Sequence, residues 1–398
     1  MISLITSTLI FVTSFLVVLS ILVFFHELGH YSVARLFKVS VERFSIGFGK
    51  PLARWKAKSG TEWTISRIPL GGYVKFLGDA GAASNPDTGR LEEIRENIGS
   101  EYGDAVVNNC FHFKPLWQRA LIVLAGPIAN FILAIVIFAG VVLMFGRTSI
   151  NSVVTEVVAG SAAEEAGVQV GDHFLTLDGY DVSEHTEFIS YVALRSDMTL
   201  EAVVKRKGDV VNFDITPRRQ ERIDGIGGKN NIGTVGVRIG GRDNIINRTY
   251  NPVTALAYGT DQLGNTLSMT GTYVKRIFQG REDGKALGGP ARIATMTGKT
   301  AVDIAKIDAP FGARLKYMLE SLLYLAAALS VGLGVANLMP IPALDGGHLL
   351  YYGYEALAGR PLSETKQEFG FRIGFALLLA ALVFLTINDI GYIRSMFS

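Results

Sequence analysis

Long apolar stretches separated by polar segments dominate the sequence. Met1 to Phe25 contains no charged side chain. About 20 apolar residues in a helix are enough to cross the hydrocarbon core of a bilayer. On this basis the predicted transmembrane helices are residues 1–38, 120–146, 319–348 and 370–390. The pattern therefore predicts a multi-span α-helical membrane protein with about four transmembrane helices.

The loop between the first two predicted spans, residues 39–119, begins with strand-like sequence. Val39 to Leu77 is rich in β-branched and aromatic residues, and Gly47, Ser59-Gly60 and Gly71-Gly72 interrupt it. This composition is typical of hairpins rather than helices. We therefore expect membrane-associated β-hairpins in this loop.

Residues 150–240 have the pattern of a separate module. Alternating strand-like residues from Val153 to Val158 precede a short helix that follows Gly160, a turn at Gly171-Asp172 and a second strand. This order resembles an α+β PDZ domain, whose exposed strand edge an extended peptide can join. A β-rich module without a ligand is the alternative. Residues 241–318 are expected to form a membrane-proximal helical segment, either on the membrane surface or packed on the module.

Charge indicates an orientation for the predicted spans. Twelve Lys or Arg lie between residues 38 and 119, and three more lie between the last two spans. By the positive-inside rule both loops are cytoplasmic, so the N-terminus, residues 147–318 and the C-terminus lie outside. The net charge of +2 gives no support for nucleic-acid binding. The single cysteine, Cys110, excludes an internal disulfide.

The sequence His26-Glu27-Leu28-Gly29-His30 follows the uncharged N-terminal run. Residues four apart on a helix share one face, so the imidazoles of His26 and His30 can converge on one zinc ion. Glu27 lies near that ion without being a ligand. It can take a proton from a water whose pKa the ion lowers, and pass it to a leaving amine. Ionisable residues inside a membrane are costly and usually functional, which argues against two histidines that merely pack in a helix.

A catalytic zinc needs a third protein ligand, and Asp345 is the candidate. It is the first ionisable residue after a run of 24 uncharged residues. Pro340 and Pro342 break the helix before it, and backbone groups freed in this way are tolerated only inside protein or beside a water-filled cavity. The alternative is that Asp345 ends the span at the interface. His348 could also be a ligand, but a supporting or structural role is favoured because it lies closer to the interface.

Three sequence blocks and the single PDZ-like module together resemble the site-2 protease family of intramembrane zinc metalloproteases. The blocks are HELGH (His26–His30), GPIAN (Gly126–Asn130) and NLMPIPALDGGH (Asn337–His348). Within the family, the bacterial regulator-of-sigma-E protease branch is the most similar. The resemblance covers nearly the whole chain. It implies one Zn²⁺ per chain on His26, His30 and Asp345, with Glu27 as general base and acid.

The resemblance also implies substrate-binding residues. Asn337 matches an asparagine that contacts substrate near the scissile bond; alternatively, its amide satisfies backbone groups freed by the prolines. Gly72, Tyr73 and Val74 match a membrane-associated β-hairpin that pairs with the unwound substrate strand. Pro340 and Pro342, in the same block as Asn337, are expected to belong to the substrate site.

The resemblance implies regulated intramembrane proteolysis in a bacterial inner membrane, with the active site near the cytoplasmic side. Expected substrates are single-span membrane proteins: anti-sigma factors of the sigma-E stress response after a first cut, and remnant signal peptides. Membrane lipid surrounds the chain, the PDZ-like module is a candidate peptide-binding site, and nucleic acid is not expected. The alternative is a non-proteolytic membrane scaffold that binds peptides through that module. A metal transporter would need polar residues along several spans, and the second and fourth carry almost none.

Overall fold

The computed structural model describes residues 2–77, 79, 108–223, 229–241, 244–281, 284 and 287–395. The chain divides into two compact units. One comprises Met1–Ile137 and Ala301–Phe384, and the other Phe138–Thr300 and Leu385–Ser398. The loop predicted at residues 39–119 is therefore described only in part.

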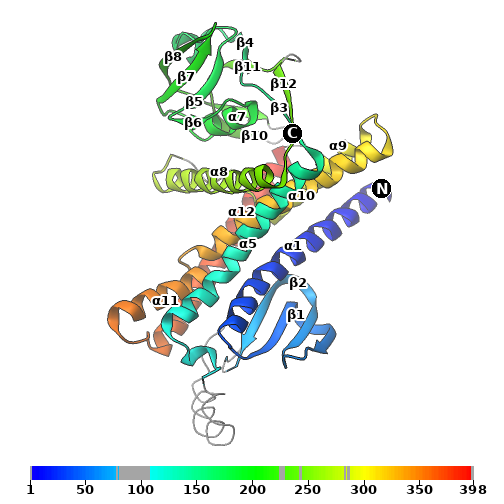
Figure 1. Ribbon diagram of the computed structural model, residues 1–398, viewed down its shortest axis with the longest axis vertical. Helices are drawn as coiled ribbons and strands as arrows, with labels where there is room; N and C mark the ends of the chain where they lie inside the picture. Colours follow the sequence, from blue (N-terminus) through cyan, green and yellow to red (C-terminus); the bar gives the residue numbers. More distant parts are fainter. Residues whose placement is uncertain are drawn as a thin grey trace, which may run out of the picture. The chain divides into compact units, whose positions relative to one another are not determined.

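Within the part of the chain that the structure describes, four helices are long and apolar enough to cross a membrane, as predicted (Figure 1). They are α1 (Ile2–Leu36), α5 (Leu116–Phe145), α10 (Phe311–Leu338) and α12 (Glu364–Ser395). A helix pairs its own backbone groups, which a bilayer core requires because it offers no water. Helix α12 extends beyond the predicted residues 370–390 at both ends. Helix α10 begins before the predicted residue 319 but ends at Leu338, ten residues before the predicted 348, because Pro340 and Pro342 interrupt it.

The hairpin of the first unit folds back on itself. It consists of β1 (Val41–Lys56) and β2 (Glu62–Phe76). Residues 43–46 of β1 pair with residues 62–65 of β2 on one side and with 72–75 on the other. Residues 72–76, here called the edge strand, therefore form an outer strand, and no other described strand pairs with its far side.

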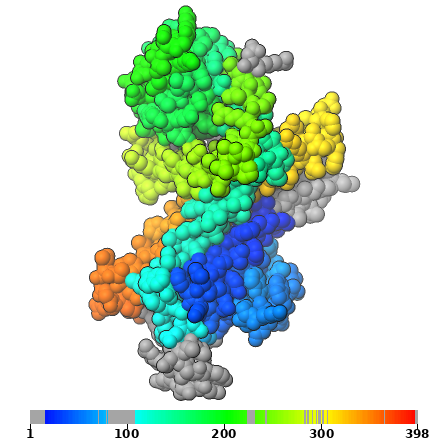
Figure 2. All heavy atoms as spheres, in the orientation of Figure 1, coloured from blue at the N-terminus to red at the C-terminus, as the bar shows by residue number. Residues whose placement is uncertain are grey.

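Aromatic and aliphatic side chains pack this hairpin against α1 and α5. Phe44, Val74 and Phe76 are buried together with Val39 and with Ile122 of α5. In Figure 2 the blue α1 and the lighter blue hairpin lie beside the cyan start of α5. This core places the edge strand next to α1, the helix that carries the two motif histidines.

The chain breaks between α10 and α11 (Asp345–Ala358). Proline lacks a backbone N–H, so Pro340 and Pro342 cannot continue the ladder of α10. A Cβ atom on Gly347 would clash with the carbonyl oxygen of Ile341, so the tight turn requires glycine there. Asp345 consequently begins a new helix rather than ending the span.

The second unit contains a β-rich module and further helices. Its largest sheet has the strand order β6-β5-β7-β8, and Phe174, Leu177 and Leu200 lie in its fully buried core. The elements are β3 (Arg147–Ile150), β4 (Val154–Val157), α6 (Ala162–Glu165), β5 (His173–Leu177), β6 (Tyr180–Asp181), α7 (His185–Ala193), β7 (Leu200–Arg206), β8 (Asp209–Ile215), β9 (Arg218–Ile223), β10 (Lys229–Thr234), β11 (Val237–Ile239), β12 (Ile245–Arg248), α8 (Pro252–Phe278) and α9 (Pro290–Lys306). Strands β3 and β12 pair with each other where the chain enters and leaves the module.

Candidate active site

Two histidines on one face of α1 form the first half of the site. His26 and His30 are both buried, and their Nε2 atoms lie 3.2 Å apart. The four-residue spacing on a helix produces this approach, because it rotates the second side chain by only about 40° from the first. The two rings can therefore share one ion.

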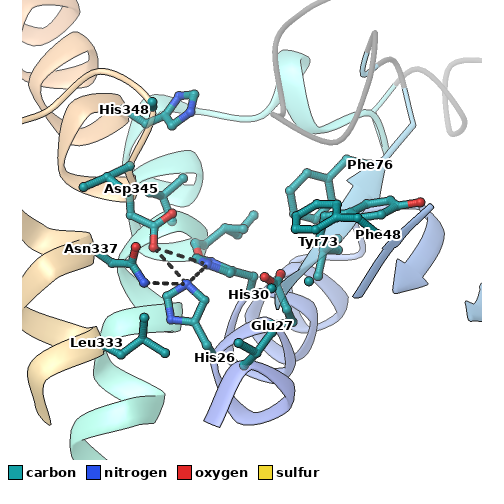
Figure 3. A pocket seen from close by; sticks show the side chains of 18 of the residues that line it. His26, Glu27, His30, Phe48, Tyr73, Phe76, Leu333, Asn337, Asp345 and His348 are labelled. Carbon is teal, nitrogen blue, oxygen red and sulfur yellow. Dashed lines mark hydrogen bonds and ion pairs between the residues drawn. The ribbon is translucent and has the colours of Figure 1, made fainter. Parts of the chain in front are cut away.

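Asp345, at the start of α11, completes the cluster (Figure 3). Its Oδ2 atom lies 3.2 Å from His26 Nε2 and 3.5 Å from His30 Nε2. Among the described residues, these three are the group of His, Cys, Asp or Glu side chains close enough to hold a metal ion. His348 is not part of that group.

The donor set fits zinc. Ligand atoms held about 2.0–2.1 Å from one tetrahedral ion lie roughly 3.3 Å from each other, which is close to the separations observed here. Asp345 Oδ2 is buried and accepts no hydrogen bond in the described structure. Two imidazole lone pairs and a carboxylate oxygen at this separation repel one another unless a cation or a proton lies between them. Two histidines and one carboxylate also leave the fourth position free for water or substrate.

Glycine allows α5 to approach α1 directly behind the histidines. A Cβ atom on Gly126 would clash with His30 Nε2, and one on Gly29 would clash with the carbonyl oxygen of Ala125. At this crossing His30 Nδ1 donates a hydrogen bond of 2.8 Å to the carbonyl oxygen of Ile122. The Asn130 side chain lies 3.1 Å from His26 Nδ1. In each histidine, Nε2 thus faces the proposed metal position and Nδ1 contacts α5.

A cavity of about 620 Å³ opens beside the three donor atoms. Its lining includes Glu27, adjacent to His26 and absent from the donor cluster. Gly72 of the edge strand packs against that glutamate: a Cβ atom there would lie 2.9 Å from Glu27 Cγ. The edge strand is therefore within reach of anything bound next to Glu27.

The structure brings most of the predicted substrate-binding residues to this cavity. Asn337 near the end of α10 lines it, as do Gly72, Tyr73 and Val74. The Asn337 amide nitrogen lies 3.4 Å from His26 Nε2. Pro340 and Pro342 are not among the lining residues; Pro340 is exposed, and a Cβ on Gly374 of α12 would clash with the Pro342 carbonyl.

Several residues that line the cavity could not be predicted from the sequence, because no motif marks them. Leu333 of α10 and Phe375 and Leu378 of α12 contribute apolar walls, and Phe48 adds an aromatic ring. Apolar residues of a predicted span give no signal of which helix face will line a cavity. His348 lines the cavity too.

Asn130 and Ile122 were not predicted to touch the histidines. Asn130 did carry a signal in the sequence, because it is an amide four residues after Gly126 within the apolar run of residues 120–146. Ile122 acts through its backbone carbonyl. No sequence pattern could identify that contact.

Comparisons with known proteins identify the family of the chain. The chain is 43% identical to the metalloprotease MmpA of Caulobacter vibrioides over 96% of both chains. It is 40% identical, again over 96% of both, to a protein of Rhizobium meliloti whose name assigns it provisionally to the zinc metalloproteases. A Mesorhizobium japonicum protein with a similar name is 40% identical over 94% of this chain and 97% of its own. The model of peptidase family M50 matches residues 14–381. The resemblance drawn from the three sequence blocks is thereby confirmed, and the chain belongs to peptidase family M50, the site-2 protease family.

Proposed function

We propose that the chain is a zinc metalloendopeptidase that cleaves membrane proteins within or next to their transmembrane segments. One observation carries this proposal: His26, His30 and Asp345 converge beside a cavity that Glu27 and the edge strand also line. His26, His30 and Asp345 would hold one Zn²⁺. When bound, zinc supplies a Lewis acid that polarises a carbonyl and lowers the pKa of water.

Glu27 is proposed as the general base and acid. It follows the first histidine directly and lines the cavity, yet its carboxylate is not in the donor cluster. It is therefore placed to take the proton of the attacking water and to deliver it to the leaving amine. Asn337, whose amide nitrogen faces the same space, is proposed to donate a hydrogen bond to a peptide carbonyl or to the developing oxyanion.

The edge strand is proposed to bind the substrate backbone. A transmembrane helix hides its peptide bonds, so a protease has to extend the substrate before cleavage. An extended segment can join residues 72–74 as an additional strand, on the side where no other described strand pairs with them, and this replaces the hydrogen bonds lost from the helix. Because Gly72 touches Glu27, a peptide bound there would lie next to the base.

The β-rich module is proposed to be PDZ-like and to lie outside the cytoplasm. Strand β4 leads to the short helix α6, whose start Ser161 caps by accepting the Glu164 N–H, and then to β5. The basic loops between the first two spans and between the last two spans support cytoplasmic placement of the hairpin, in a bacterial inner membrane. Single-span proteins already trimmed outside the membrane, including anti-sigma factors and remnant signal peptides, are the proposed substrates, as in the regulator-of-sigma-E branch.

Glu27→Gln tests the proposal in purified full-length protein. Zinc content should stay near that of the parent, about one ion per chain, because the three donors remain. Cleavage of a pre-trimmed single-span protein should fall by a factor on the order of 10² or more. Glu62→Gln, on the hairpin but outside the cavity lining, is the matched control and should cleave normally.

Full activity of Glu27→Gln would contradict the mechanism and favour the peptide-binding scaffold. Absence of zinc from the parent protein would contradict the metal assignment. Mass spectrometry of membranes from cells that carry the parent or Glu27→Gln would identify the natural substrates as fragments present only with the parent.

A further inference from the structure

One face of α5 contacts both histidines of the proposed zinc site. Ile122, Gly126 and Asn130 are spaced four residues apart, so they share that face. The Ile122 carbonyl meets His30 Nδ1 at 2.8 Å, and the Asn130 side chain meets His26 Nδ1 at 3.1 Å. Gly126 lies between them, where a side chain would clash with His30.

The Ile122 contact determines which nitrogen of His30 carries the proton. A carbonyl oxygen can only accept a hydrogen bond, so His30 Nδ1 must be the protonated nitrogen. Its Nε2 atom then has a free lone pair, which points toward Asp345 Oδ2 3.5 Å away. His30 is therefore held in the tautomer that a metal on Nε2 requires.

For His26, the ring nitrogen that carries the proton depends on the Asn130 amide, because an amide can either donate or accept a hydrogen bond. With Asn130 Nδ2 toward His26 Nδ1, the amide donates and the ring proton has to sit on Nε2, between the other donors. That arrangement would block the metal.

We propose that Asn130 is a positioning residue that accepts the Nδ1 proton of His26 through its Oδ1 atom. A 180° rotation of the amide exchanges two atoms of nearly equal size and requires no backbone movement. His26 Nε2 then presents its lone pair toward zinc, as His30 Nε2 does. The inference rests on the proposed zinc site and adds that α5 selects the tautomer of both ligands.

The backbone of Asn130 makes a further contact that is separate from its side-chain contact to His26. The residue is fully buried, and its backbone carbonyl accepts a 2.8 Å hydrogen bond from Ser330 Oγ of α10. A purely structural role would use this backbone contact and the volume of the side chain. The proposed role uses the acceptor atom of the side chain, so substitutions can separate the two.

Zinc affinity of the full-length protein, measured by competition with a chelator, tests the inference. Asn130→Leu keeps the branched shape of the side chain and removes the acceptor, and should bind zinc 10- to 100-fold more weakly. Asn130→Asp keeps an acceptor and should remain within a few-fold of the parent. Ser330→Ala, the matched control, removes only the contact to the backbone and should leave zinc affinity unchanged.

Parental affinity in Asn130→Leu would overturn the inference. So would equal weakness of the Asp and Leu variants, provided that zinc-free Asn130→Asp unfolds at the parental temperature. If Asn130→Asp does not fold, ¹⁵N resonances of labelled histidine in the zinc-free parent decide the matter. They should show the His26 proton on Nδ1, and a proton on Nε2 would contradict the proposal. A parent that binds no zinc would instead refute the proposed function.

Discussion

At the scale of single residues, the site depends on a glycine, because a side chain at that position would occupy the space of the two histidines. Gly126 carries no side chain where α5 meets the histidines, and a Cβ there would clash with His30 Nε2 and lie 2.8 Å from His26 Cε1. Interiors are close-packed, so one methyl group has to displace something. The nearest groups are the two proposed zinc ligands.

Gly126→Ala is therefore expected to disturb the ligands more than the fold. Zinc affinity should fall at least about 10-fold and cleavage with it, since ligand geometry needs to be held within about 0.5 Å. Zinc titration and a cleavage assay would measure both. Gly140→Ala, in the same helix but with open space around its Cβ, is the control and should behave like the parent. Equal behaviour of the two variants would show that α5 does not constrain the ligands.

At the scale of elements, the break between α10 and α11 carries Asp345 to the histidines. The two prolines end the α10 ladder, and Gly346 and Gly347 allow the turn to fold tightly against residues 338–342. An uninterrupted helix would carry Asp345 about 10 Å further along its axis from Leu338, at 1.5 Å per residue. The irregular segment is thus what places the carboxylate.

Gly347→Ala tests the importance of this turn. The added methyl group would clash with the Ile341 carbonyl oxygen and lie 2.5 Å from Pro342 Cα, so the turn has to open and move Asp345. Zinc content and cleavage should both fall by about 10-fold or more, because a misplaced ligand costs affinity of this order. Gly353→Ala, in α11 with free space around it, should match the parent. Normal zinc content in Gly347→Ala would rule out this role for the turn.

At the scale of the whole molecule, the proposed orientation predicts which segments face the cytoplasm. Cys110 is the only cysteine of the chain and can be replaced first. A cysteine introduced at Gly60 should then react with a membrane-impermeant thiol reagent only from the cytoplasmic side, because the basic first loop is retained there. A cysteine at Asp209 should react only from outside. Reversed labelling would overturn the orientation.

The module is proposed to restrict which substrates reach the cavity. If it excludes bulky external domains, deletion of residues 152–239 should allow cleavage of a single-span protein with an intact external domain. A pre-trimmed substrate should still be cut at a similar rate, since only the steric barrier changes. If the module recruits substrates by peptide binding, the deletion should slow cleavage of the trimmed substrate and leave the intact one uncut. Glu27→Gln in the same deletion is the blank.

The sequence by itself determined the features that depend on local spacing. Four apolar helices follow from the lengths of uncharged runs, and the approach of His26 to His30 follows from the geometry of one helix turn. The break before Asp345 follows from two prolines, because a residue without an N–H cannot continue a helix. Each of these is set by neighbours within a few residues along the chain.

Only the tertiary structure decided the contacts between residues that lie far apart in the sequence. Asp345 reaches both histidines. The register of the hairpin places residues 72–74 where no further described strand pairs with them, and α5 presents Ile122 and Asn130 to the rings. The physical reason is that packing between membrane helices depends on the combined fit of many side chains from distant parts of the chain. A sequence pattern can therefore name the ligands, while the packing decides how they are oriented.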